Sequence, residues 1–163
     1  MQVSRQGDDE IVDAVVTASR AMIAVAVRSL SGLAEDITIA QYRTLVVLAS
    51  RGPQKLADLA EQLAVTAPTA GRMADRLVRR GLVTRHRGED DRRVVRIAIT
   101  PAGRDVVDEA TRHRRAIIAE ILSGVPAGRS GEIAAALRDF AGAAGEIPDD
   151  EWPPGPVEAA GKV

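Results

Sequence analysis

Arginine and threonine side chains recur along residues 66–80 at spacings that place several of them on one side of a helix. Thr69, Arg72 and Arg76 lie three and four residues apart, and residues so spaced are neighbours on a helix surface. A guanidinium group pairs through two hydrogen bonds with phosphate oxygens or with the edge of guanine. These residue types therefore indicate binding to a nucleic acid, which carries both phosphates and bases.

The positive charge of the chain is concentrated around this stretch. Residues 66–104 hold ten arginines and four acidic residues, a net charge of +6, whereas residues 1–65 carry −2 and residues 105–163 carry −5. A basic module in a chain of net charge −1 is the electrostatic footprint of a DNA reader. The alternative, that these arginines only form a solvated face, is weaker because a helix and the following hairpin are basic together.

Two short helices must position these side chains. Leu56, Leu59, Ala60 and Leu63 recur at i, i+3, i+4 and i+7, which predicts the first helix. After a tight turn at 64–66, Thr66 is placed to cap the second helix, and Gly81 is suited to the left-handed position beyond its end. The inner stripe expected for this second helix consists of Ala70, Met73, Ala74, Leu77 and Val78.

A hairpin follows the second helix. Alternating, β-branched runs at 82–87 and 94–99 flank a charged tip at 88–93, and Thr100-Pro101 predicts the cap and first turn of another helix. We therefore predict a mainly α fold with a small two-stranded β wing, a winged helix-turn-helix. The second helix of such a pair lies in the major groove of duplex DNA.

Three segments carry a family resemblance: ITIAQYRTL at 37–45, LADLAEQLAVTAPTAGRMADRLVRRGLVTR at 56–85 and DDRRVVRIAITPAG at 90–103. Over about residues 37–104 the chain resembles the MarR family of bacterial regulators. The resemblance implies a homodimeric DNA-binding regulator, commonly a repressor released by a small aromatic or phenolic ligand. It also implies that Arg93 enters the minor groove and that Asp91 holds it. The alternative is a surface ion pair between Asp91 and Arg93.

Base edges should meet the first turns of the second helix. Ala67 and Pro68 offer apolar contact, Thr69 can form a hydrogen bond, and Arg72 is the best candidate for guanine recognition, with a phosphate contact as its alternative. Arg79 and Arg80 are expected to be phosphate clamps or surface charges. The predicted DNA-contacting residues are Thr66, Ala67, Pro68, Thr69, Arg72, Arg76, Arg85, Arg87, Asp91, Arg92 and Arg93.

Long apolar helices flank this module. One is expected from about residue 8 to residue 33, another at 38–48, a third from 101 to about 123 and a last one at 130–145. Because the chain ends have little of their own subunit to pack against, we predict a homodimer formed by them. Trp152 either pins the polar C-terminal tail to the body or is exposed. The predicted regions are 1–36, an N-terminal dimerisation helix; 37–100, the DNA-binding domain; 101–146, C-terminal dimerisation helices; and 147–163, a flexible tail.

An effector site between the dimer helices and the DNA-binding lobe is implied by the resemblance. Its possible polar lining groups, which could meet a carboxylate or phenolate, are Arg20, Tyr42, Arg43, His113 and Arg114. Each is equally compatible with an interface or surface role. No cofactor is expected. A metal site is not expected either, because His86 and His113, with Glu109 beside the latter, do not supply the four ligands of zinc.

The sequence lacks the motifs that are typical of other functional classes. The sequence has no phosphate-binding glycine loop, nucleophile elbow or His-Glu metal motif, which argues against an enzyme. The absence of cysteine excludes switching by thiol oxidation. No apolar run approaches the length of about 18 residues that spans a membrane, so we expect a cytoplasmic protein. A winged helix used only for protein assembly is the alternative to a DNA-binding regulator.

Overall fold

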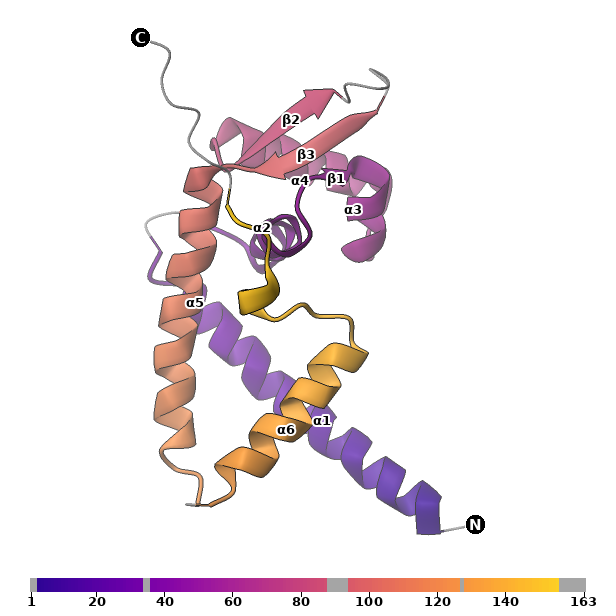
Figure 1. Cartoon of the computed structure of the whole chain (residues 1–163), viewed down its shortest axis with the longest axis vertical. Helices are drawn as coiled ribbons and strands as arrows, with labels where there is room; N and C mark the ends of the chain where they lie inside the picture. Colours follow the sequence, from indigo (N-terminus) through magenta and orange to yellow (C-terminus); the bar gives the residue numbers. More distant parts are fainter. Residues whose placement is uncertain (1–2, 34–35, 88–93, 127, 156–163) are drawn as a thin grey trace.

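The computed structural model describes residues 3–33, 36–87, 94–126 and 128–155 (Figure 1). A winged-helix lobe sits at one end, and the long helices α1 and α5 extend away from it, with α6 crossing α1 (Figure 1). The elements in chain order are α1 (Val3–Leu30), α2 (Ile39–Arg51), β1 (Gln54–Lys55), α3 (Leu56–Gln62), α4 (Ala67–Arg79), β2 (Val83–Arg87), β3 (Val95–Ile99), α5 (Pro101–Leu122), α6 (Ser130–Ala143) and the 3-10 turn η1 (Asp149–Glu151).

Local hydrogen bonds begin the helices that frame the lobe. The hydroxyl of Thr38 accepts from the backbone N–H of Gln41 at 3.2 Å, and the Gln41 side chain accepts from the Thr38 N–H at 3.0 Å. This capping box satisfies two backbone donors at the start of α2. At the start of α5, the Thr100 hydroxyl accepts from the Gly103 N–H at 3.0 Å, with Pro101 in the first turn. The cap predicted at Thr100 is confirmed.

The sheet has three strands in the order β1-β3-β2, all antiparallel. The predicted β2–β3 hairpin is present, with Val83 opposite Ile99 and Arg87 opposite Val95. The prediction of a two-stranded wing missed β1, because a strand of two residues carries no periodic pattern. The hairpin tip, with Asp91, Arg92 and Arg93, lies outside the described residues.

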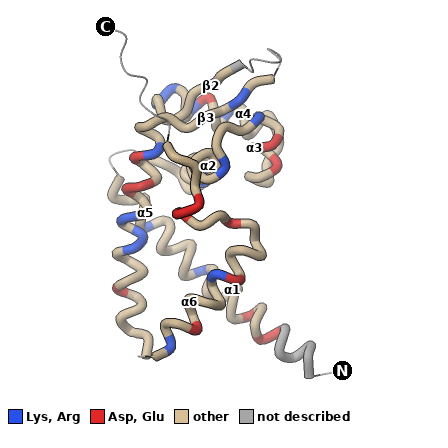
Figure 2. Tube along the Cα trace, viewed as in Figure 1, with Lys and Arg blue, Asp and Glu red and all other residues tan. Residues whose placement is uncertain are grey.

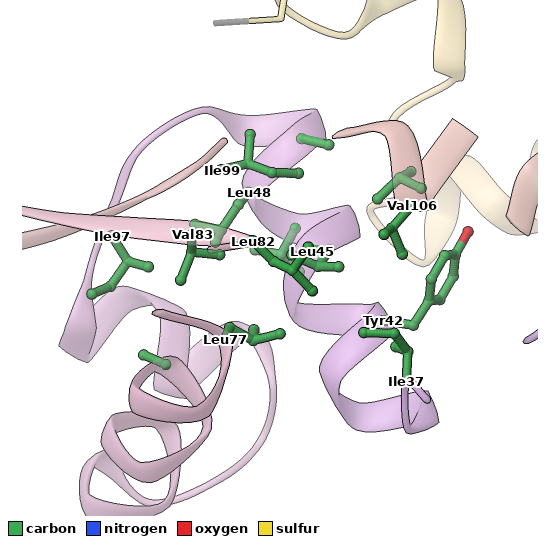
Figure 3. Close-up of a cluster of buried hydrophobic side chains, with 14 of the residues drawn as sticks. Ile37, Tyr42, Leu45, Leu48, Leu77, Leu82, Val83, Ile97, Ile99 and Val106 are labelled. Atoms are coloured by element: carbon green, nitrogen blue, oxygen red, sulfur yellow. The ribbon is translucent and has the colours of Figure 1, made fainter. Parts of the chain in front are cut away.

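One apolar cluster holds the lobe together (Figure 3). Leu45 and Leu48 of α2, Leu77 of α4 and Ile97 of β3 are each at most 1% exposed. Val107 of α5 belongs to the same cluster, so the long helix is anchored in the lobe by burial of its first turns. Close packing of such side chains resists displacement of α4 relative to the sheet.

The far ends of the long helices leave an apolar face uncovered. None of the residues of α6 is buried, and Phe140 is 54% exposed. Between α1 and α6 lies an apolar groove of about 870 Å³. None of the helices in the described ranges is long and apolar enough to cross a membrane. The exposed large apolar residues of these ends are Ile11, Val12, Val16, Met22, Ile23, Val27, Ile121, Leu122, Leu137 and Phe140.

The bounds of α1 and α2 differ most from those predicted. α1 begins at Val3 and ends at Leu30, several residues earlier at each end than the expected 8–33, and α2 continues to Arg51 rather than ending near 48. Helix ends without a strong cap are poorly specified by apolar periodicity.

Trp152 lies against the body of the protein. Its indole Nε1 donates to the carbonyl oxygen of Ile147 at 2.8 Å, and the Cζ atom of Arg104 lies 5.3 Å from the ring centroid. The ring is half-buried and packs on the core cluster. The sequence leaves two alternatives open for Trp152. The structure shows the one in which Trp152 pins its segment of the chain to the body of the protein.

Candidate nucleic-acid interface and ligand cavity

A tight turn and a small buried face fix the orientation of α4. Ala64 adopts a left-handed φ of 52°, and the Val65 N–H donates to the Ala60 carbonyl at 3.0 Å, which closes the turn from α3. Ala70 and Ala74 are buried, so α4 lies close to its neighbours. The prediction that Val78 lies on the inner stripe is wrong, since it is 37% exposed at the edge of this narrow face.

The first turns of α4 present polar side chains to solvent. Ala67 and Pro68 are exposed, and the Arg72 Nη2 donates to the Thr69 hydroxyl at 3.1 Å. Thr66 occupies the capping position, but its side chain makes no capping hydrogen bond, contrary to prediction. One of the two usual partners is Pro68, which has no N–H. The Thr66 hydroxyl instead lies 3.0 Å from that of Thr69.

Arginines of α4 and the arginine at its C-terminal cap, Arg80, differ in their surroundings. Arg72 and Arg76 are exposed and line one side of a hollow of about 240 Å³, whose other side includes Thr38 and Gln41 at the start of α2. Arg80 is engaged within the lobe, where its Nη1 donates to the Asp36 carbonyl at 2.6 Å. The structure thus brings the predicted contacts Arg72 and Arg76 together on one face.

Basic residues of the sheet lie beside α4 in the lobe (Figure 2). Arg85 points toward that helix, where it pairs with Asp75 and donates to the Gly71 carbonyl. Arg87 pairs through its backbone with Val95 at the end of the described hairpin. The side chain of Arg87, like residues 91–93, lies outside the described part of the chain.

A cavity of about 590 Å³ separates the lobe from the long helices. Tyr42 and Arg43 of α2 form one wall, while Arg114 and Arg115 of α5 form another. The Cζ atom of Arg114 lies 4.9 Å from the centroid of the Tyr42 ring, a cation–π contact. The buried Arg114 Nε has no hydrogen-bond partner among the described residues. Guanidinium and aromatic groups together suit a small anionic or aromatic ligand.

The predicted effector residues are only partly gathered at this cavity. Tyr42, Arg43 and Arg114 line it, whereas Arg20 is exposed on α1 and His113 has its Nδ1 atom 3.4 Å from the Ser29 carbonyl. Within the described residues, neither of the latter two belongs to the lining. Sequence reasoning missed Arg115, Glu146 and Asp149 and left Trp152 undecided. The lone tryptophan in a polar tail was the one available signal.

Both the sequence and the fold are similar to those of known proteins. The model of the MarR family matches residues 37–95. The HTH-type transcriptional repressor MdtR of Bacillus subtilis is 34% identical over 89 residues, 55% of this chain and 57% of that protein. The chain spans about half the length of the curated relatives it matches.

Solved structures extend the likeness beyond the lobe. The RV1404 protein of Mycobacterium tuberculosis is 42% identical, with a TM-score of 0.79 over 86% of this chain and 95% of that one. FabT of Streptococcus pneumoniae, crystallised in complex with DNA, is 23% identical, with a TM-score of 0.66 over 84% and 96% of the two chains. The family model covers the lobe and the likeness to a solved relative spans nearly its full length, so this chain belongs to the MarR family.

Proposed function

We propose that the protein is a transcriptional regulator that binds double-stranded DNA through α4, its recognition helix. The observation that carries this proposal is one face of α4 that Thr69, Arg72 and Arg76 share, on which the two arginines are exposed. Its 13 residues form a rod about 20 Å long, which the major groove of B-DNA admits. The structure of FabT in complex with DNA supports DNA as the partner of this fold.

The active form in this proposal is a homodimer. The uncovered apolar face of α1, α5 and α6 supports pairing with a second copy, because an apolar patch of this kind marks an interaction surface. A two-fold axis would present two recognition helices to successive major grooves. The operator is then a pseudo-palindrome with half-sites about one helical turn apart.

The cavity beside Tyr42 is the site proposed for an effector, a small aromatic or anionic molecule. It lies between the DNA-binding lobe and the long helices, so a ligand there can alter the separation of the two recognition helices. Release of DNA then follows from a higher ligand affinity for the separation that does not fit DNA. The name of MdtR supports repression as the outcome of DNA binding.

Fluorescence anisotropy of the full chain on labelled duplex DNA tests the proposal. The duplex comes from upstream of the protein's own gene, with a scrambled duplex and a salt series beside it. Selective binding that persists at physiological salt is the expected result. Equal, weak and steeply salt-dependent binding to both duplexes would show only the nonspecific phosphate contribution. If a folded protein bound neither duplex, a role as an assembly module would replace DNA binding.

A further inference from the structure

Residues 145–152, here called the strap, run from the end of α6 back to the lobe. The Arg51 Nη2 of α2 donates to the Gly145 carbonyl at 2.6 Å. At the other end, Trp152 packs on the core cluster beneath Arg104. The strap therefore ties α6, the most exposed helix of the proposed dimer face, to the DNA-binding lobe.

The carboxylate of Glu146, in the strap, pairs with the guanidinium group of Arg43. Both nitrogens at the end of Arg43 face the Glu146 carboxylate, with Nη1 donating to Oε2 at 2.9 Å. Both residues line the 590 Å³ cavity, and both also line the apolar groove between α1 and α6. The pair therefore lies between the cavity proposed for an effector and the face proposed for the dimer.

A two-point carboxylate–guanidinium contact is the contact that an anionic ligand would itself make with Arg43. Asp149 also faces Arg115, in a longer ion pair with 3.9 Å between Oδ2 and Nη2. Two of the cationic groups of the cavity therefore face carboxylates of the chain's own C-terminal segment. The Arg43 and Glu146 side chains are 42% and 45% exposed, so solvent weakens their pairing enough for a ligand to displace Glu146.

We propose that the strap is an internal competitor for the ligand cavity: an anionic ligand takes Arg43 from Glu146 and so removes one of the two contacts by which α2 holds the chain just beyond α6. The inference rests on the ligand cavity of the proposed function. It adds a route from that cavity to the dimer face, because Glu146 follows the last residue of α6 by only three positions. Ligand binding and strap release are then one equilibrium.

The full chain, with benzoate as the probe, tests this competition. Benzamide has the same shape without the charge and serves as the neutral probe. Trp152 is the only tryptophan and lines the cavity, so its emission reports binding. Glu146→Gln is expected to tighten benzoate binding about twofold to fivefold, the range of an exposed ion pair, and to leave benzamide binding unchanged. Glu132→Gln removes an acid paired with Arg129 on the surface of α6 and should change neither.

A double-mutant cycle separates competition from simple charge repulsion. In an Arg43→Gln background, Glu146→Gln should have no effect on benzoate binding, because the contested group is gone. Thermal melting checks that each variant is folded.

Two results would overturn the inference. The same gain from Glu146→Gln with and without Arg43 would mean simple charge repulsion, and no gain would mean that the strap stays in place. Each of these results would leave the proposal of a ligand cavity standing. Absence of benzoate binding in all four cycle variants would remove both the strap inference and the proposed effector site, while anisotropy still decides DNA binding independently.

Discussion

Arg85 on β2 reaches the recognition helix, where its Nη2 lies 2.8 Å from the Asp75 Oδ1 and donates to the Gly71 carbonyl at 3.2 Å. The two contacts lie four residues apart on α4 and hold the strand against one side of that helix. The sequence predicts a DNA contact for Arg85. Its contacts with α4 indicate a second role, in which Arg85 fixes the position of the β2–β3 wing.

Asp75→Asn is expected to weaken operator binding about twofold to fivefold, the range measured for exposed ion pairs. The direction is informative, because removing a negative charge beside DNA would by itself raise the affinity. Asp58→Asn, at an exposed acid in the first turn of α3, provides the charge-matched control and should not weaken binding. Anisotropy on the operator measures both variants. Tighter binding by both would show that Asp75 acts only as a charge.

Arg72→Ala and Arg76→Ala should differ in kind. Loss of Arg72 is expected to cost about 1–3 kcal/mol on the operator and to relax preference at one base position, since it lies nearer the start of α4. Loss of Arg76 should weaken operator and scrambled duplex alike and reduce the salt slope by about one. Anisotropy on a set of single-base operator variants distinguishes the two. Equal losses on all duplexes for Arg72→Ala would assign it to a phosphate.

Gly103→Ala is expected to destabilise the fold. A Cβ atom at Gly103 would lie 2.1 Å from the Leu82 carbonyl oxygen, so the first turn of α5 would have to move away from the loop before β2. Overpacking of this kind costs about 1–3 kcal/mol, or several degrees in Tm. Gly71→Ala, whose Cβ would meet Leu56 at an ordinary 3.8 Å, should be neutral or slightly stabilising. Thermal unfolding followed by circular dichroism compares them, and equal Tm values would contradict the close contact.

Phe140→Glu should dissociate the proposed homodimer. The ring is 54% exposed in a single chain, on the edge of the groove between α1 and α6, and a charge there would be desolvated by a second copy. We expect the dimer dissociation constant to rise by more than about a hundredfold. Val78→Glu places the same charge on an exposed apolar residue of the lobe and should leave the dimer intact. Sedimentation velocity over a concentration series measures both, and a wild-type monomer at all concentrations would contradict the dimer.

Features set by neighbouring residues were predictable from the sequence. Gly81 has the left-handed φ of 69° expected beyond the end of α4, and the Leu82 N–H donates to the Leu77 carbonyl at 3.0 Å. Such caps and turns depend on contacts within a few positions along the chain. The same holds for the helix-turn-helix and for the face shared by Arg72 and Arg76. The sequence by itself therefore determined the order of the helices and of the β2–β3 hairpin, and the face of α4 on which Arg72 and Arg76 lie.

Features set by residues far apart in the chain were decided only by the tertiary structure. The pairing of Arg85 with Asp75 is not visible in the sequence, and neither is the pairing of Glu146 with Arg43, more than a hundred positions away. β1 forms because its two residues find an open edge of β3. The periodicity of residues along a helix or strand indicates which face of that element a side chain occupies. The charge partner of the side chain depends on which other element the fold brings opposite to that face.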